Sequence, residues 1–188
     1  MMTPRLPTYI ETERLVLRHW TEEDLPAMAA AITASLEHLR PWMRWVAHEP
    51  LSVKDRLTLI RRWHHEWEDG GDTVVGVFAD HVVVGGSGLH RRVGDTALEI
   101  GYWIHVDHTR KGLATETAAA LTTAAFAVPG IERIEIHHDK ANLASAGVPR
   151  RLGFTLVGEA PRDAEAPAEI GIECRWVMTR QTWVERAG

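Results

Sequence analysis

The alternation of apolar and polar positions predicts an opening strand followed by two helices. Apolar and polar residues alternate over residues 13–20, which indicates a strand. Thr21 then offers an N-cap, and the acidic residues 22–24 suit the positively polarised first turn of a helix. Ser52 offers the N-cap of a second helix, whose apolar residues recur at helical spacing until the glycine pair at 70–71 ends it.

The middle of the chain is richer in strands. Alternating or β-branched runs predict three strands, at residues 73–79, 82–89 and 96–105. An alanine-rich helix follows, from Gly112 to Phe126. Beyond it the pattern predicts a strand, a short helix and two strands, at residues 133–138, 142–152, 154–158 and 169–182. The acidic and proline-rich residues 161–168 predict a mobile loop.

This order of elements predicts an α/β fold of the α+β kind with a mixed central sheet. Reading along the chain, the order is β-α-α-β-β-β-α-β-α-β-β. The chain has 188 residues, without an internal repeat or a recognisable linker, which argues for one domain spanning residues 1–188. Its 45% hydrophobic and 25% charged residues are typical of a globular protein that can bury its own core.

Composition and charge narrow the classes of function and location. The single cysteine, Cys174, has no internal disulfide partner, which fits a reducing compartment, and we interpret it as a small buried hydrophobe. The N-terminus lacks an apolar leader and no run of eighteen apolar residues occurs, so we expect a cytoplasmic protein without a membrane partner. A net charge of −5 argues against nucleic acid and is compatible with a cationic acceptor. Because no Cys/His pattern has zinc-site spacing, we expect no metal.

The most informative segment joins a strand to a helix through a short basic loop, over residues 98–126. Gly112 lies where that helix begins, where amide N–H groups lack partners and the helix dipole is positive. Glycine lets an anion approach the backbone, and Arg110 and Lys111 add positive charge, so the corner suits a phosphate. Spacing alone also allows a corner without a ligand. The glycine-rich run at 85–88 lies inside a strand pattern and indicates a bulge or a close backbone approach.

A family resemblance enters at this loop. Residues 109–114, Thr-Arg-Lys-Gly-Leu-Ala, resemble the acyl-CoA pyrophosphate loop of GNAT N-acetyltransferases, written Arg/Gln-x-x-Gly-x-Gly/Ala. Further segments over residues 11–158 are similar, in family order, to the RimJ/RimL-like branch: ETERLVLRHW, HLRPWMRW, EIGYWI, GLATETAAAL, IERIEIHHDKANLAS and RRLGF. The joint match, rather than any single motif, carries the resemblance.

The resemblance implies a GNAT-like domain in which the strand at 99–105 splays from the strand at 133–138, leaving a V-shaped opening flanked by helices. The pantetheine arm of acetyl-CoA would lie in that opening, its pyrophosphate on the amides of residues 110–115, and its thioester near the Asn-x-x-Ser motif. The residues assigned to the cofactor are therefore Trp103, Ile104, His105, Arg110, Lys111, Gly112, Leu113, Ala114, Thr115, Asn142 and Ser145.

Two positions depart from the family pattern. Thr109 stands where the loop usually begins with Arg or Gln, so one side-chain contact is lost or passes to Arg110. Pro149 stands where many relatives place a tyrosine that protonates the departing thiolate. No tyrosine is available in this predicted helix, so that version of the mechanism is excluded, and proline predicts a kink that would alter how Ser145 points.

Amide formation needs a neutral amine, donors for the acyl oxygen and a thiolate that can leave. We expect Glu99 to be the base, directly or through water, although a solvated charge at a strand end explains it equally well. Glu116 is an alternative carboxylate, which helix-dipole complementarity already explains. Ser145 would position the sulfur or relay a proton. The resemblance places the acceptor wall at Ser35, His38, Leu39, Trp42 and Trp45, which could instead be core residues.

The leading hypothesis is transfer of an acetyl group from acetyl-CoA to a primary amine, most simply the N-terminal α-amine of a ribosomal-type protein. The same chemistry on a small amine, such as an antibiotic, a polyamine or an amino acid, is a second reading, and a succinyl-CoA-using relative is a variant of it. A non-catalytic acyl-CoA-binding module is a third. The oligomeric state stays open, with a homodimer that shares acceptor-side surface as one alternative.

Overall fold

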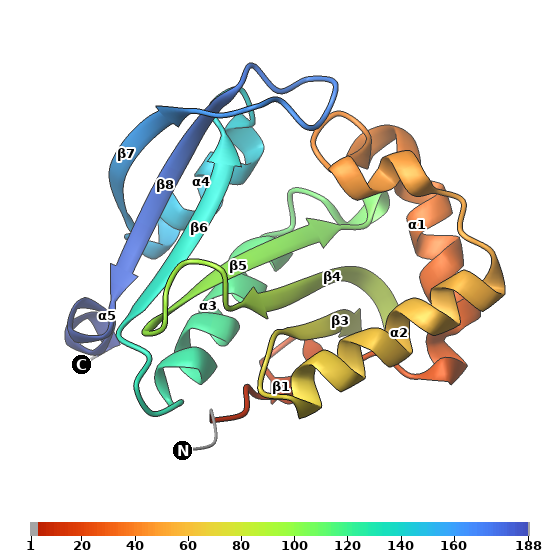
Figure 1. Cartoon of the computed structure of the whole chain (residues 1–188), viewed down its shortest axis with the longest axis horizontal. Coiled ribbons are helices and arrows are strands. Elements are labelled where there is room, and N and C mark those ends of the chain that lie inside the picture. The colour runs from red at the N-terminus through yellow and green to blue at the C-terminus, as the bar shows by residue number, and fades with distance from the viewer. Residues whose placement is uncertain (1–3, 188) are drawn as a thin grey trace.

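A mixed sheet of eight strands, in the order β1-β2-β3-β4-β5-β6-β8-β7, runs through the molecule (Figure 1). The computed structural model describes residues 4–187. Neighbouring strands are antiparallel except for β5 and β6, which are parallel. The strands are β1 (Tyr9–Glu11), β2 (Val16–His19), β3 (Thr73–Ala79), β4 (Val82–His90), β5 (Ala97–Ile104), β6 (Arg133–Asp139), β7 (Thr155–Pro161) and β8 (Ile172–Thr179).

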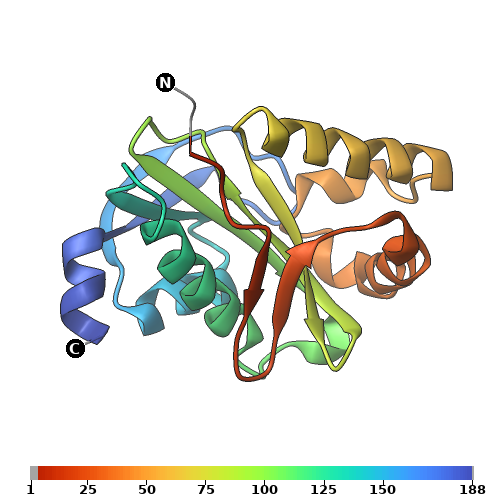
Figure 2. The same ribbon diagram turned by 90° about the horizontal axis from the view of Figure 1, so that it is seen from below.

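Helices cover both faces of the sheet, with α2 and α3 on opposite sides (Figures 1 and 2). They are α1 (Leu25–Leu39), α2 (Val53–Glu68), α3 (Leu113–Phe126), α4 (Leu143–Leu152) and α5 (Arg180–Ala187), with short 3₁₀ turns η1 (Glu22–Asp24), η2 (Arg44–His48) and η3 (Val106–His108). Two buried clusters follow from this layering: α3 and α4 contribute to the larger one, and α1 and α2 to the smaller. The predicted caps are present, since Thr21 and Asp24 form a capping box and Ser52 accepts the Asp55 amide at 3.1 Å.

The sheet opens between β5 and β6, as predicted. Their pairing runs only from Ala97↔Arg133 to Glu99↔Glu135, whereas the other edge of β5 stays paired with β4 as far as Ile104. Beyond Glu99 the two strands diverge, and the β6-facing edge of β5 carries backbone groups without strand partners. This unpaired edge is the feature that positions the site.

The structure differs from the predicted elements in four places. The short strand β1 and the helix α5 were not predicted, and the last strand runs over Ile172–Thr179 instead of 169–182. The loop at 161–168 was expected to be mobile, yet contacts hold its C-terminal end. The buried Asp139 carboxylate accepts the amides of residues 170, 171 and 172 at 3.1, 3.0 and 3.3 Å, and the Ala168 amide donates to the Pro41 carbonyl at 3.0 Å. These partners are distant in sequence, so composition alone could not indicate them.

No helix among residues 4–187 has the length and the apolar character needed to cross a membrane.

Candidate active site

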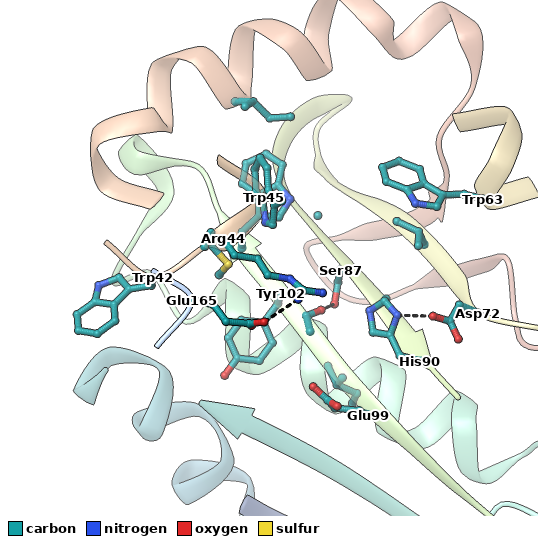
Figure 3. Close-up of a pocket in the computed structure, with 18 of the residues that line it drawn as sticks. Trp42, Arg44, Trp45, Trp63, Asp72, Ser87, His90, Glu99, Tyr102 and Glu165 are labelled. Carbon is teal, nitrogen blue, oxygen red and sulfur yellow. Dashed lines mark hydrogen bonds and ion pairs between the residues drawn. The ribbon is translucent and has the colours of Figure 1, made fainter. Parts of the chain in front are cut away.

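A cavity of about 1020 Å³ lies between the α1–α2 layer and the splay of the sheet (Figure 3). Five tryptophans line it: Trp20, Trp42, Trp45, Trp63 and Trp103. At its other end it reaches Tyr102, Asn142 and Ser145, where β5 and α4 border the splay. One continuous space therefore joins an aromatic wall to the open strand edge.

The cavity brings together part of the predicted acceptor wall. Trp42 and Trp45 line the cavity, and Trp45 lies against Trp103 with ring centroids 6.2 Å apart. Ser35 and Leu39 are buried inside the helix layer, and His38 is exposed outside the cavity. These three residues lie before the end of α1 and do not line the cavity. From α1 itself, Met28 and Ile32 line the cavity, and Trp42 and Trp45 follow after the helix end.

Ser35 has a structural task. Its hydroxyl oxygen accepts the Val106 amide at 3.1 Å, which ties α1 to the turn that follows β5.

On the free edge of β5, only alternate residues point their backbone groups into the splay. The His105 amide donates to the Val84 carbonyl on β4 at 2.9 Å, so His105 cannot offer that amide to a ligand in the splay. Backbone groups alternate sides along a strand, so Trp103 also faces β4, while Tyr102 and Ile104 face the splay. Of the three backbone positions expected from the sequence, Ile104 keeps its place and Tyr102 replaces the other two.

The helix start at Gly112 has the geometry of an anion cradle. Gly112 has φ of 78°, in the left-handed region, and N-caps α3. The first helical bond runs from the Glu116 amide to the Gly112 carbonyl at 3.0 Å, so the amides of residues 113–115 have no intrahelical acceptor. Among the described residues, a β-carbon built at Gly112 would meet only the Arg14 guanidinium, at 3.6 Å. The backbone is therefore open to a ligand here.

Three cations surround this cradle, and one was not predicted. Arg110, with φ of 59°, and Lys111 are exposed beside it. Arg14 arrives from the loop between β1 and β2, donates to the Lys111 carbonyl at 3.0 Å and pairs with Glu116 at 2.6 Å. A guanidinium thus stands beside the loop that begins with Thr109 in place of Arg or Gln. Glu116 holds Arg14 in position, which accounts for this carboxylate without a catalytic role.

Asn142 and Ser145 open α4, which continues through Pro149. The Asn142 side chain accepts the Ser145 amide at 3.1 Å and so caps the helix. Pro149 has no N–H to donate to the Ser145 carbonyl one turn earlier. The Tyr102 hydroxyl takes that place, donating to this carbonyl at 3.2 Å and lying 3.1 Å from the Ser145 hydroxyl.

Tyr102 therefore brings a phenol next to Ser145, at a helix that has no tyrosine of its own. Its hydroxyl comes from β5, 43 residues before Ser145, and no pattern within the helix segment could indicate it. Burial raises the pKa of Tyr102 to about 12, against the opposing effect of its hydrogen bond with Ser145. The phenol is protonated at neutral pH and can act as a donor.

Glu99 lines the cavity, but its carboxylate is already engaged. Arg92 binds both of its oxygens, at 2.6 and 2.8 Å. Burial alone would raise the pKa of Glu99, but the hydrogen bonds and charge of Arg92 outweigh it, so this pKa lies below its usual value. A carboxylate held in this way is a weaker base than an ordinary glutamate. Of the two readings of Glu99, a solvated charge at a strand end does not describe this buried ion pair.

Other charged groups give the cavity an acidic balance. Eight Asp and Glu residues line it against five arginines. His137 lies among carboxylates, with Nε2 at 2.6 Å from Glu135. His90 bonds Asp72 at 2.7 Å on the same sheet face (Figure 3). Among residues 4–187, no three His, Cys, Asp or Glu side chains gather in a way that could hold a metal ion.

Comparison with known proteins identifies the family of this chain. A model of the acetyltransferase (GNAT) domain matches residues 14–155. The chain is 29% identical over 150 residues to "Putative ribosomal N-acetyltransferase YdaF" of Bacillus subtilis (strain 168), covering 79% of this chain and 81% of that one. It is 27% identical over 161 residues to "Uncharacterized N-acetyltransferase YoaA" of the same organism, covering 79% and 84%.

Solved structures share the fold. RimL, a ribosomal L7/L12 α-N-protein acetyltransferase in complex with coenzyme A, superposes with a TM-score of 0.83 at 20% identity, covering 93% of this chain and 99% of that one. RimJ of Mycobacterium smegmatis, in complex with a CoA-disulfide, gives a TM-score of 0.83 at 22% identity, covering 96% and 91%.

Proposed function

Because the chain belongs to the acetyltransferase (GNAT) family and is an N-acetyltransferase of its RimJ/RimL-like branch, we propose that it transfers an acetyl group from acetyl-CoA to a protein N-terminal α-amine. One observation carries the proposal: a single cavity joins the free edge of β5 to an aromatic and acidic wall. Such a space lets a donor and an amine meet end to end.

The residues present fit coenzyme A. The open amides of residues 113–115, with Arg14, Arg110 and Lys111 around them, suit a diphosphate at a helix N-terminus. The unpaired backbone of Tyr102 and Ile104 suits the amide groups of a pantetheine arm, which would lie along β5 as an added strand. The structures of RimL and RimJ, which share the fold, are complexes with coenzyme A and with a CoA-disulfide, which supports the same ligand here.

Acetyl-CoA, when bound, supplies an acyl group activated as a thioester. Amide groups on the free edge of β5 would hold the acyl oxygen as negative charge grows on it. The amine nitrogen forms the new C–N bond, and the C–S bond breaks with its electron pair on sulfur. The Ser145 hydroxyl, next to Tyr102, donates a hydrogen bond to that sulfur, which leaves easily because a thiol pKa is only about 8.5.

The acceptor is inferred from the size and charge of the cavity. At about 1020 Å³ it lies at the upper end of the range for small-molecule sites, which leaves room for the first residues of a peptide. Its excess of carboxylates attracts an ammonium group, and its tryptophans can bind one. An α-amine, with a pKa of about 7.7–8.0, gives up its proton far more easily than a lysine near 10.4. The similarity to ribosomal N-acetyltransferases supports a protein acceptor.

One contact favours a second candidate, a compact small-molecule amine. Arg44 and Glu165 form an ion pair at 2.8 Å between η2 and the loop before β8, and the Ala168 amide donates to Pro41 beside it. The ion pair, drawn in Figure 3, connects two segments that line the cavity. A closed rim would admit a small amine more readily than a folded protein, although an exposed ion pair of this kind is weak enough to open.

A donor and acceptor panel tests the proposal. Acetyl-CoA and succinyl-CoA are each offered with a peptide bearing a free N-terminus, the same peptide with its N-terminus blocked and one lysine, and a set of polyamines and amino acids. We expect thiol release with acetyl-CoA and the free N-terminus, and little with the blocked peptide. Turnover of small amines alone would favour the second candidate. Tight coenzyme A binding without any turnover would contradict both and support a binding module.

A further inference from the structure

A histidine–carboxylate pair in the cavity is used by no step described so far. His90 is the last residue of β4, and its Nδ1 lies 2.7 Å from Asp72, which immediately precedes β3. The second Asp72 oxygen accepts the Arg91 amide at 2.7 Å. Burial tends to raise the pKa of Asp72, but its bonds with His90 and Arg91 outweigh this and lower it, so the carboxylate is charged at neutral pH.

The other ring nitrogen of His90 is free to act. A carboxylate at Nδ1 favours the tautomer with its proton on Nδ1, which leaves a lone pair on Nε2. Within residues 4–187, Nε2 has no hydrogen-bond partner. It lies above Gly88 and Gly101, which pair across β4 and β5: a β-carbon would come within 3.0 Å of Nε2 at Gly88 and within 3.6 Å at Gly101. Two glycines thus leave space around this nitrogen on the cavity side.

The position of Gly101 brings this nitrogen close to the reacting end of the site. Pairing between β5 and β6 ends at Glu99, so Gly101 lies two residues into the splay. It is flanked by Tyr102, whose hydroxyl reaches Ser145. His90 lines the same cavity as the tryptophan wall and Tyr102, and Figure 3 shows its ring beside Asp72 and Ser87.

Three other groups of the cavity are less suited to accept a proton. Glu99 is bound by Arg92 and its pKa is lowered. His137 gives Nε2 to Glu135, and its Nδ1 is shared between Glu99 and Glu173 at 3.8 and 3.5 Å. The two ring nitrogens of His138 contact the Asp139 carbonyl and the indole N–H of Trp176.

We propose that His90 is the general base of the transfer, with Asp72 orienting its ring and stabilising the imidazolium. This inference rests on the proposed function. A protonated amine must lose two protons to become an amide. The first passes to His90 Nε2 and from there to water, which frees the nitrogen lone pair for the new C–N bond. The second ends on the departing sulfur, which is released as the thiol.

Several charged groups face His90 and will shape its titration. Asp72 contacts it from the loop before β3, and Glu99 stands opposite it on β5 with Arg92 beside it. The same cavity is lined by charged residues of α2, β6 and β8, namely Asp55, Arg56, Arg62, His137, His138, Asp139 and Glu173. A pH profile must therefore be assigned by substitution.

The test compares the wild-type protein with His90→Gln, Asp72→Asn and His65→Gln. His65 is the matched control, because its Nδ1 also lies near a carboxylate, Glu68 at 3.5 Å, on the exposed face of α2. We expect His90→Gln to lower kcat/KM by about 100-fold near pH 7, the usual contribution of a general base. Coenzyme A affinity by calorimetry and the thermal midpoint should stay at wild-type values, and His65→Gln should behave as wild type throughout.

Asp72→Asn supplies a readout independent of turnover. Loss of the carboxylate makes the imidazolium less favourable, so the His90 ring followed by NMR in the free protein should titrate at lower pH. The acidic limb of the kcat/KM profile should move by the same amount. A purely structural role for the pair would lower the thermal midpoint and leave that limb in place.

Wild-type turnover and an unchanged pH profile in His90→Gln would overturn the assignment while leaving the proposed function intact. The same holds if His90 and the acidic limb respond differently to Asp72→Asn. A wild-type protein that transfers no acyl group to any acceptor of the panel would overturn the proposed function, and the role of His90 with it.

Discussion

The two sides of the splay are built in different ways. The donor side, made of the free edge of β5, residues 110–115 and the start of α4, consists mainly of backbone groups and comes from short stretches of chain. The acceptor side, made of the cavity walls, consists of side chains from η2, α2, the sheet face and the loop before β8. A cradle of backbone groups suits coenzyme A, the ligand that members of such a fold would share. The acceptor-side side chains come from distant segments, so each can be substituted without the others.

This contrast teaches that the donor side should tolerate few changes and the acceptor side many. A cradle of amides depends on a conformation, here the left-handed Gly112, that few other residues adopt. The acceptor wall instead depends on identities, such as Trp45 against Trp103 or Arg44 with Glu165. The following experiments separate the two sides, beginning with the largest expected effect.

Substitution of Gly112 by aspartate should remove coenzyme A binding. A negative charge at the cradle costs several kcal/mol against a diphosphate, so affinity should fall by about 100-fold or more. Gly130→Asp is a matched control, since Gly130 has φ of 84° and open space around it, away from the cradle. Calorimetry with coenzyme A measures both variants. Equal losses in the two would mean that backbone strain, rather than a phosphate site, explains the effect.

Truncation of Trp45 should act on the acceptor side alone. Loss of one aromatic face costs about 1–2 kcal/mol, which corresponds to roughly a tenfold rise in KM for the acceptor. Coenzyme A affinity should not change. Trp183→Ala on α5, outside the cavity lining, is the control and should leave that KM as it is. Steady-state kinetics at saturating acetyl-CoA would refute the acceptor wall if Trp45→Ala kept the wild-type KM.

Substitutions at Tyr102 and Pro149 should have coupled effects on stability. The Tyr102 hydroxyl donates to the Ser145 carbonyl, which receives no N–H from Pro149. Tyr102→Phe should lower the free energy of unfolding by about 1–2 kcal/mol, the cost of an unsatisfied buried carbonyl. Adding Pro149→Ala to that variant supplies an N–H and should recover much of the loss. Urea unfolding of the two single variants and the double variant measures the coupling. Strictly additive effects would show that the two residues act independently.

The smallest expected effect is on the stability of the protein at acidic pH. His19 on β2 stacks on His64 of α2 at 5.2 Å, and burial, with the charge of His64 as a smaller cause, lowers the pKa of His19 from 6.5 to about 4. The unfolded chain binds this proton near pH 6.5 and the folded chain only near pH 4, so stability is lost as pH falls between these values. His19→Gln should flatten that part of the stability profile, measured by urea unfolding at about pH 7 and pH 5. If the stability of the variant falls between these two pH values as steeply as that of the wild type, His19 does not cause the loss.

The same contrast explains what could be predicted from the sequence. The helix caps, the splay between β5 and β6 and the glycine at the start of α3 are local, or are carried by family motifs, and the structure shows each of them. The close approach inferred for the glycine run is also present, since a β-carbon at Gly86 would lie 2.5 Å from the Trp103 indole. Patterns along one segment are enough for such features.

The parts that were missed depend on contacts across the sequence. Arg14 reaches the cradle from 97 residues away, Tyr102 reaches Ser145 across 43, and His90 reaches Asp72 across 18. Hydrophobic period and spacing carry no signal for such pairs. Ser35 and Leu39 show the opposite case, because the segment that resembles an acceptor wall also contains buried residues of a helix.

The central claim is that coenzyme A binds on the donor side, with its diphosphate at Gly112 and its arm along β5. A crystal structure of the protein with coenzyme A tests this most directly. We predict diphosphate oxygens within hydrogen-bond distance of the amides of residues 113–115, and pantetheine amides paired with Tyr102 and Ile104. Coenzyme A bound elsewhere, or strands β5 and β6 paired along their whole length, would contradict the account.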